Sequence, residues 1–288
     1  MALVALRMVS LAIAGNWRAV WRWMGLCALV LFGWWYGITP RNDRDWMPDV
    51  SRGVTAEPVA NGWRLHNIRN FDWTTETDAV PAWYDLTVDP DRITSVDMIL
   101  STWGNPDIAH TLVSFGFEDG QHVVFSTETR KEKGEIYSTL GGFFRLYELV
   151  LIAADERDIV RLRTDLRGEQ VALYPIDLAA EQRKALFMAF LDYGNDLAEN
   201  PKWYNTLTAN CTTVPYMMVR KFSDRVTLDR RMMLPGRLPE YLHELGVLAK
   251  GHDMAEVRKR AALGPQGPGG DDSHAFSARI RAKWTVPR

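Results

Sequence analysis

The sequence predicts an α+β domain that is preceded by one apolar helix. Residues 23–40 form an uncharged run with Trp at its start and Trp-Trp-Tyr near its end. From residue 62 to about residue 176, short apolar or alternating runs between turn residues indicate β-strands. Beyond residue 177 the apolar residues recur at helical spacing. Strands followed by helices are typical of α+β domains, and a chain of 288 residues, 47% hydrophobic, is long enough for one sizeable core.

Residues 23–40 are predicted to be a transmembrane helix, because roughly 17–25 helical residues cross a bilayer and Trp and Tyr gather at its two surfaces. Arg7, Arg18 and Arg22 precede the run, and no acidic residue occurs before Asp43. This asymmetry predicts a single-pass inner-membrane protein, with residues 1–22 as a cytoplasmic or interfacial segment and the remainder in the periplasm. A buried core helix is the alternative, whereas a cleaved signal peptide fits less well because small residues are missing at the end of the run.

Residues 41–57 are polar and contain Pro48, so they are interpreted as a linker. Residues 58–250 are predicted to form the periplasmic domain. Residues 251–288 include the string GPQGPGGDDSH and are interpreted as a flexible C-terminal tail.

Strands are expected from residue 62, over 147–154 and over 173–176, and residues 95–103 are expected to form a strand or a short helix. The strongest local signal is the string AHTLVSFGFEDGQHVVFSTETR, in which two β-rich runs flank Asp119-Gly120. Such a dipeptide between apolar runs predicts a hairpin. Helices are expected over the string AAEQRKALFMAFLDYGNDLAEN, which stops at Asn200-Pro201, over 211–222, and within 234–246.

Cys211 is the candidate nucleophile. The only other cysteine, Cys27, lies in the apolar run, so no disulfide can form within the exported part. Cys211 opens a predicted helix, because Thr208 or Asn210 can cap it and Pro215 is tolerated only in its first turn. The positive end of the helix should lower the pKa of the thiol from about 8.5. Backbone N–H groups there can hold an oxyanion, with Asn210 and Thr212 as supporting residues.

His110, at the start of the hairpin, is the candidate base. With a three-residue turn, Phe117 pairs with Gln121 and the register places His110 opposite Glu128, which would complete a Cys-His-carboxylate set. A two-residue turn would place Thr129 there instead, so both alternatives stay open.

Four strings resemble one known family: HNIRNFDW, DIAHTLVSFGFEDGQHVVFSTETRKEKGE, GGFFRLYELVLIAADERDIVRLRT and WYNTLTANCTT. Over roughly residues 45–245 the chain resembles the N-terminal periplasmic domain of the bacterial lipoprotein N-acyltransferases of the Lnb type. The resemblance implies a permuted papain-like (NlpC/P60-like) fold, in which an antiparallel sheet precedes the Cys-bearing helix. It also implies Cys211 as nucleophile, His110 as base and transfer of a fatty acyl chain from a phospholipid, through an acyl-thioester, to a lipoprotein amine. No later segment is apolar over 18 residues, whereas that family continues into further membrane segments, and whether an integral-membrane partner supplies them stays open.

Other residues have both a functional and a structural interpretation. Trp203 and Tyr204 could line an acyl groove or belong to the core, and Arg130 could hold a phosphate headgroup or lie in a solvated loop. A net charge of −2 argues against nucleic-acid binding. No nucleotide, zinc or dithiol motif occurs in the sequence, so neither a metal nor a cofactor is expected.

Three functional hypotheses follow. The first is a membrane-anchored cysteine acyltransferase or lipid-ester hydrolase that acts on phospholipid and lipoprotein substrates. The second is a peptidase or amidase of cell-wall peptide with the same nucleophile and base, and the third is a non-catalytic membrane-anchored scaffold with an inert Cys211.

Overall fold

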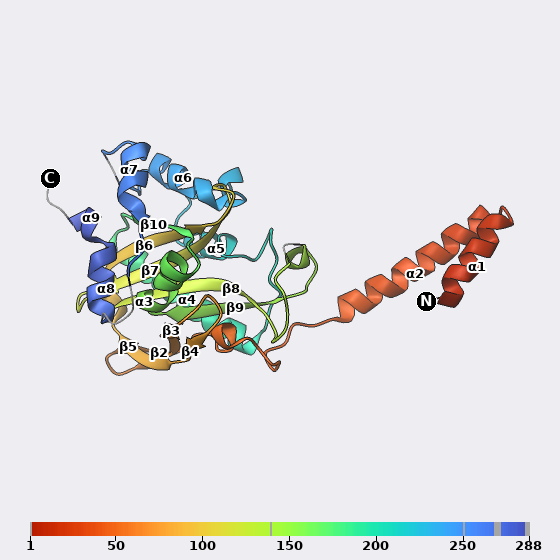
Figure 1. Cartoon of the computed structure of the whole chain (residues 1–288), viewed down its shortest axis with the longest axis horizontal. Coiled ribbons are helices and arrows are strands. Elements are labelled where there is room, and N and C mark those ends of the chain that lie inside the picture. The colour runs from red at the N-terminus through yellow and green to blue at the C-terminus, as the bar shows by residue number, and fades with distance from the viewer. Residues whose placement is uncertain (1, 139, 250, 268–271, 286–288) are drawn as a thin grey trace. The chain divides into compact units, whose positions relative to one another are not determined.

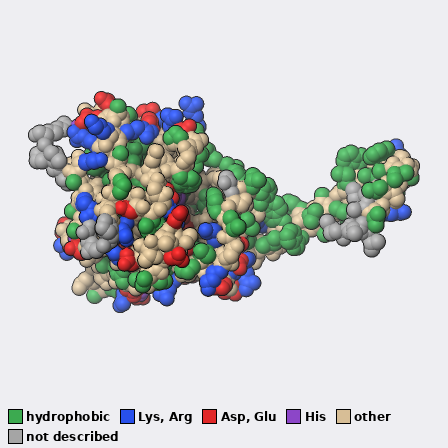
Figure 2. Space-filling view, in the orientation of Figure 1, with side chains coloured by type: hydrophobic (Ala, Val, Ile, Leu, Met, Phe, Trp, Pro, Cys, Tyr) green, Lys and Arg blue, Asp and Glu red, His purple; other side chains and the backbone are tan. Residues whose placement is uncertain are grey.

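The computed structural model describes residues 2–138, 140–249, 251–267 and 272–285, and the chain divides into two compact units, Met1–Arg41 and Asn42–Arg288. Unit 1 contains α1 (Ala2–Ile13) and α2 (Trp17–Gly37), and the Asn16 side chain caps α2 by accepting from the Ala19 N–H at 3.2 Å. Figure 2 shows hydrophobic side chains over much of this unit.

A helix forms across most of the run over residues 23–40 that was predicted to span a membrane. Over the described residues, no helix combines the length and the apolar character needed to cross a membrane. The helix that forms begins at Trp17 and ends at Gly37, so it includes Arg18 and Arg22 and leaves out the last predicted residues. These two guanidinium groups lower the mean hydropathy of the helix.

Unit 2 is a mixed α+β domain with a mostly antiparallel sheet, as predicted (Figure 1). The strands of the main sheet lie in the order β1-β2-β9-β8-β7-β6-β10-β11, β5 pairs with β2, and only β2 and β9 are parallel. Its strands are β1 (Thr55–Val59), β2 (Gly62–Arg69), β5 (Trp83–Val88), β6 (Ile93–Thr102), β7 (Ala109–Phe117), β8 (His122–Arg130), β9 (Glu148–Ala154), β10 (Gln170–Pro175) and β11 (Ala262–Leu263), while β3 (Asp72–Trp73) and β4 (Ala79–Val80) form a separate pair.

Helices cover both faces of the sheet. The helices of unit 2 are α3 (Glu156–Arg161), continued by a π-helical turn (Leu162–Leu166), α4 (Ala180–Glu199), α5 (Thr213–Arg220), α6 (Leu238–Glu244), α7 (Met254–Ala261), α8 (Ser273–Ile280) and α9 (Ala282–Thr285), with short 3₁₀ turns at Pro48–Val50, Pro90–Arg92, Gly141–Phe143, Arg230–Met232 and Pro235–Arg237. In Figure 1, α6 and α7 lie beside the β10 end of the sheet and β5 lies at the opposite end.

Alternation along the strands divides the core between the two faces. On one face, Phe115 and Phe125 pack against Phe187 and Phe190 of α4, with ring centroids 4.9–5.8 Å apart. On the other face, residues such as Leu112 and Val124 pack against α3 and α8. We call these the α4 face and the α3 face.

Of the two turn lengths left open by the sequence, the β7–β8 hairpin has the three-residue turn. The Phe117 N–H donates to the Gln121 carbonyl at 2.9 Å, and Gly120 adopts a φ of +84°, which favours glycine. Pairing runs back from Gly116–His122 and stops at Leu112–Ser126. Beyond that pair β7 stays with β6 to Ala109–Thr102, and β8 stays with β9 to Arg130–Glu148. The two strands therefore separate into a fork where His110 and Glu128 lie.

The string HNIRNFDW, one of the four that carry the family resemblance, contributes Arg69 to a buried ion pair. Arg69 holds Asp158 through two hydrogen bonds of 2.8 and 3.0 Å, and the Trp73 indole N–H donates to the same carboxylate at 2.7 Å. Asp158 is fully buried. The string HNIRNFDW is thus explained by its contacts with α3, because a buried charge needs paired donors.

The predicted linker and tail both differ from the structure. The Met47 N–H donates to the Lys131 carbonyl and Val50 is buried, so residues from Asn42 onward belong to the domain. The interval 251–288, predicted to be flexible, contains α7, β11, α8 and α9. Phe276 of α8 is buried and Arg281 binds Asp97 and Glu156, both of which lie in the core. The Gly/Pro-rich string marks only a connection, part of which lies outside the described residues.

Candidate active site

Cys211 lies directly before α5, on the α4 face of the sheet. The predicted helix over 211–222 is found as Thr213–Arg220, with Pro215 in its first turn. The Asn210 side chain caps this helix, because its Oδ1 accepts from the backbone N–H groups of Thr212 and Thr213 at 2.8 and 2.9 Å. Asn210 therefore fixes where the chain turns at Cys211.

His110 and Glu128 meet on the α3 face, as the predicted register requires. The Nε2 of His110 lies 3.0 Å from Glu128 Oε1 and 2.7 Å from the Ser126 hydroxyl. Ser126 also donates to Glu128 at 2.7 Å, and Arg163 of the π-helical turn donates to it at 3.3 Å. The imidazole is thus held at one nitrogen, which leaves Nδ1 for proton exchange with the thiol.

The fork between β7 and β8 lets the two halves of the site meet. Where the strands separate, the Thr111 N–H donates to the Cys211 sulfur, and the imidazole of His110 forms a hydrogen bond with the same thiol. A continuous β7–β8 ladder would place backbone between the two faces. The structure therefore brings Cys211, His110 and Glu128 together.

Electrostatics favour a thiolate–imidazolium pair. Burial raises the pKa of the Cys211 thiol, but His110 and the Thr111 N–H outweigh burial and hold this pKa below its usual value. Burial lowers the pKa of His110, but Glu128 and Cys211 outweigh it and raise the pKa to about 10. The pKa of Glu128 stays far below its usual range despite burial, because His110 and Arg163 stabilise the carboxylate. The ionised form of the thiol is the nucleophilic form.

The backbone of Cys211 itself offers an oxyanion donor. Within the described part of the chain its N–H has no hydrogen-bond acceptor. The neighbouring N–H of Thr212 is already taken by Asn210. Asn210 Nδ2 is also occupied, since it donates to the Thr206 carbonyl at 2.7 Å. Asn210 and Thr212 thus stabilise the loop that precedes α5, and the N–H that remains free is that of Cys211.

Of the predicted substrate contacts, Tyr204 lies nearest to the site. Burial, followed by the charge of Cys211, raises the pKa of Tyr204 well above its usual range, so its phenol stays protonated. Trp203 is half-buried and forms a β-bridge with Glu148 beside β9. Trp203 therefore extends the sheet beside the first residue of β9.

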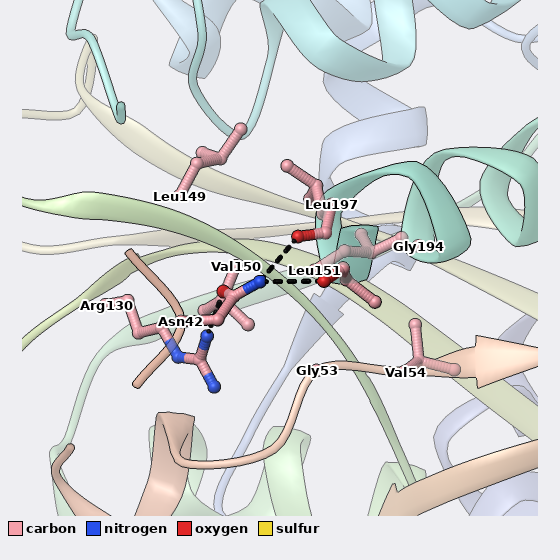
Figure 3. A pocket seen from close by; sticks show the side chains of 10 residues that line it. Asn42, Gly53, Val54, Arg130, Leu149, Val150, Leu151, Gly194 and Leu197 are labelled. Carbon is pink, nitrogen blue, oxygen red and sulfur yellow. Dashed lines mark hydrogen bonds between the residues drawn. The ribbon is translucent and has the colours of Figure 1, made fainter. Parts of the chain in front are cut away.

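Arg130 is not available to a headgroup, which corrects its interpretation as a phosphate contact. It is buried, and its guanidinium donates to the Val50 and Ser51 carbonyls and to Asn42 Oδ1 (Figure 3). It also lies over the Trp46 ring, 4.6 Å from the centroid. Arg130 thus connects β8 to Asn42, Val50 and Ser51, at the start of the domain. It also lines a small cavity of about 210 Å³.

A larger apolar cavity of about 460 Å³ adjoins the site. It lies on the α4 face, between the sheet and the segment that runs from α5 through α6. Its walls include Val113 of the sheet, Val219 of α5, Val226 of the following loop and Leu242 of α6. We call it the apolar cavity.

An exposed apolar loop also lies near the site. Ile136 is 88% exposed, and Leu140, Phe144 and Leu146 are exposed as well. The loop is joined to the segment before Cys211, because the Thr206 N–H donates to the Gly142 carbonyl at 2.9 Å. Large exposed apolar clusters of this kind mark interaction surfaces.

Sequence reasoning missed Ser126, Arg163 and Thr111. Ser126 could have been found, since it lies two residues before Glu128 on the same side of a strand. The position of Arg163 depends on the π-helical turn, and the contact of the Thr111 N–H with Cys211 depends on the fork. No local sequence pattern predicts either feature. Among the residues described, no group of three or more His, Cys, Asp or Glu side chains is arranged to hold a metal ion.

Comparison with known proteins identifies the family. The model of the Lnb N-terminal periplasmic domain matches residues 79–242, more than half of the chain. The chain belongs to the Lnb N-terminal periplasmic domain family. The match includes His110, Glu128 and Cys211, and family membership places the domain in the periplasm. No curated protein and no solved structure matches the chain, so the papain-like, NlpC/P60-like fold stays a prediction.

Proposed function

We propose that this domain is a periplasmic cysteine acyltransferase or lipid-ester hydrolase that forms an acyl-thioester on Cys211. The observation that carries the proposal is the contact of Cys211 with His110, whose imidazole is held by Glu128. A nucleophile paired with an oriented base is the arrangement that covalent acyl transfer needs. The family supports a periplasmic setting for this chemistry.

The first half-reaction acylates the enzyme. The Cys211 thiolate attacks the carbonyl carbon of an ester, and the Cys211 N–H stabilises the oxyanion that develops. The C–S bond forms, the C–O bond breaks, and His110 gives its proton to the departing alkoxide. Glu128 keeps the imidazole oriented and stabilises its charged form, in the way a carboxylate does in a catalytic triad.

The second half-reaction releases the acyl group. An amine or a water molecule attacks the thioester carbonyl, its proton passes to His110, and the C–S bond breaks to restore the thiolate and imidazolium. An amine acceptor, such as the N-terminus of a lipoprotein, gives acyl transfer, and water gives hydrolysis. An integral-membrane partner that delivers the acceptor is part of this proposal.

Phospholipid is the proposed acyl donor. The apolar cavity beside the thiol and the exposed apolar loop around Ile136 both support a lipid substrate over a wall peptide. Unit 1 supports attachment to a membrane surface, since residues such as Leu6, Ile13 and Trp21 are exposed and arginine is the only charged residue there.

The test is acylation of the full-length protein by phospholipid vesicles, followed by intact mass. We expect an acyl adduct on the wild type that hydroxylamine removes, because hydroxylamine cleaves thioesters. Cys211→Ala should abolish the adduct. Cys27→Ala is the matched control, since Cys27 lies in α2 outside the domain, and it should keep the adduct.

Three outcomes would overturn the proposal. An adduct that persists in Cys211→Ala would place the chemistry elsewhere. Release of cell-wall fragments by the wild type, with no lipid adduct, would assign the same cysteine to a peptidase or amidase. If iodoacetamide labels Cys211 only slowly at neutral pH and no substrate reacts, the domain is a scaffold.

A further inference from the structure

Exposed apolar side chains gather at one end of the main sheet. Strands β6 and β8 end there, β7 and β9 begin there, and the connections over residues 103–108 and 131–147 join them. In Figure 1 the second connection extends beyond β8 and β9. Both connections, and the loop before Cys211, carry large apolar side chains that are exposed. We call this set the apolar rim: Trp103, Ile108, Ile136, Leu140, Phe144 and Leu207.

The apolar rim borders the catalytic residues along the chain. Ile108 lies two residues before His110, and Leu207 lies four residues before Cys211. The loop over residues 131–147 begins directly after β8, the strand of Glu128. That loop is joined to the segment before Cys211 by the backbone hydrogen bond described above. A surface that binds the apolar rim is therefore brought close to the site.

The other ends of the same strands have a different chemistry. The turn between β7 and β8 exposes Glu118 and Asp119, and the turn before β6 exposes Asp91 and Arg92. In these two turns, every residue of which the structure describes, no large apolar side chain is exposed. Apolar side chains exposed singly are normal, but a set gathered around one site marks an interaction surface.

The composition of the apolar rim favours a lipid bilayer over a protein as its partner. Its side chains come from three separate loops, and a fluid bilayer admits loop tips of unequal height, whereas a protein needs one contiguous complementary surface. Trp103 and Phe144 belong to it, and aromatic side chains of this kind, Trp above all, gather where hydrocarbon meets headgroups. Between residues 136 and 147 the only charged residue is Arg145, which suits an anionic lipid surface.

The chain also enters the domain at this end of the sheet. Trp46 forms a β-bridge with Glu132, and the Lys133 N–H donates to the Asp45 carbonyl at 2.8 Å. Unit 1, in which arginine is the only charged residue, ends a few residues earlier, at Arg41. If unit 1 is attached to a membrane, the domain is therefore tethered by the end that carries the apolar rim.

We propose that the apolar rim is a membrane-binding surface of the domain, whose side chains insert into the headgroup region of a lipid bilayer and turn the site towards the lipids. Membrane binding by the rim does not depend on the chemistry of Cys211, whereas its effect on acylation rests on the proposed function. A thiol held at the bilayer surface reaches an ester at the headgroup level without transfer of the lipid into water.

The experiment measures the membrane depth of a single NBD fluorophore on the full-length protein, in vesicles of phosphatidylcholine and phosphatidylglycerol. Ile136→Cys carries the fluorophore in the rim, and Cys27→Ala with Cys211→Ala removes the other thiols. We expect its emission to shift to the blue in vesicles and to be quenched by lipids with a doxyl group on the acyl chain. Val80→Cys is the matched control, because Val80 is 63% exposed beyond the opposite ends of β2 and β9, and its fluorophore should stay in water.

A second measurement links the apolar rim to the reaction. Ile136→Ser combined with Phe144→Ser should lower acylation of Cys211 by phospholipid vesicles roughly tenfold, because less apolar surface leaves water. The same protein should react with p-nitrophenyl acetate, a soluble ester, as the wild type does. Val80→Ser should leave both reactions unchanged. If Ile136→Cys fails to fold, Leu140→Cys, which replaces a side chain that is 71% exposed, carries the fluorophore instead.

The outcomes separate this proposal from the proposed function. A rim fluorophore that stays in water overturns it, and the rim then belongs to an interface with a protein. Equal quenching at Val80 and in the rim means adsorption without orientation and also overturns it, as does an equal loss of reaction with the soluble and the vesicle ester. Quenching in the rim alone, with no acylation of Cys211 by either ester, supports the membrane-binding surface and contradicts only the proposed function.

Discussion

Two ionic clusters on the α3 face of the sheet, both of which include a residue of β7, show how a stabilising cluster differs from a reactive one. In the first, Arg281 lies 2.7 Å from Asp97 and 2.6 Å from Glu156, which accepts from Ser114 at 2.6 Å. Asp97 and Glu156 have exposed fractions of 2% and 0%. Helix α8, which leads to Arg281, packs against α3. We call this the Arg281 cluster.

In the second cluster, the site, a serine again bridges to a carboxylate, here Ser126 to Glu128. Here the imidazole of His110 joins the guanidinium of Arg163 beside the carboxylate, and the Glu128 side chain is 21% exposed, against 0% for that of Glu156. Arginine keeps its charge at every accessible pH, whereas histidine can exchange its proton. The Arg281 cluster, with a permanent cation and buried carboxylates, therefore stabilises the fold. The site, where His110 can exchange a proton at the fork between β7 and β8, is able to react.

The largest expected effect is on the reactivity of the site, which the Arg281 cluster does not share. His110→Ala should slow alkylation of Cys211 by iodoacetamide at neutral pH, and lower acyl transfer about 10²–10⁴-fold, as loss of a general base does. In the wild type the thiolate is present above the lowered pKa of Cys211, and the imidazolium persists until the pH approaches about 10. The rate of alkylation against pH measures the pKa of the thiol, which should rise in the variant. Equal profiles in both proteins would show that the pair is not coupled.

Next in size is the loss of Arg281. Arg281→Ala leaves the Asp97 and Glu156 carboxylates buried without a cation, so the free energy of unfolding should fall by about 3–5 kcal/mol. In the wild type, burial raises the pKa of Glu156 but Arg281 outweighs it, and the pKa is held at about 2. Glu156 thus stabilises the fold above its unfolded pKa, and this contribution is lost as the pH falls towards 2.

Chemical denaturation of the Arg281→Ala protein at several pH values checks this expectation. The difference from wild type should be largest at neutral pH and shrink in acid, where protonated carboxyls need no cation. Arg279→Ala is the control, because Arg279 is exposed in the last turn of α8, two residues before Arg281. A wild-type unfolding curve in Arg281→Ala would restore the interpretation of residues 251–288 as a flexible tail.

The smallest effect tests the positioning role of Glu128. Glu128→Gln keeps the shape but removes the charge that raises the pKa of His110, so the upper pH limit of activity should fall below that of wild type. Acyl transfer should drop by roughly 10–100-fold, the usual cost of losing a group that orients a functional imidazole. The pH profile of kcat/KM is the measurement. A uniform loss at all pH values would mean that Glu128 acts only on the structure.

Local patterns were sufficient to predict several elements. Asp119-Gly120 predicts the hairpin, and with a three-residue turn, one of the two turn lengths considered, counting residues along the two strands places His110 opposite Glu128. Helix α4 was predicted because its apolar residues keep a helical period up to Asn200-Pro201. These predictions depend on short stretches of chain, within which turn chemistry and periodicity are decisive.

Contacts between distant segments were not predictable from such patterns. The Arg281–Asp97 pair joins residues 184 positions apart, and only the fold brings them together. The same is true of Arg163, whose place beside Glu128 depends on a π-helical turn. Arg130 was misjudged because a basic loop and a buried strand end have the same composition. The sequence also does not show that β7 and β8 separate, although this separation admits Cys211.

The separation of the strands has a spectroscopic consequence. A backbone amide in a sheet is normally held by the carbonyl of a neighbouring strand, but the Thr111 amide is held by the sulfur of Cys211. Its proton therefore senses the charge on that sulfur directly. Proton release from the thiol, or its conversion to a thioester, should shift the Thr111 amide resonance and change its exchange with deuterium. A single nitrogen-labelled threonine would then report each step of turnover from inside the sheet.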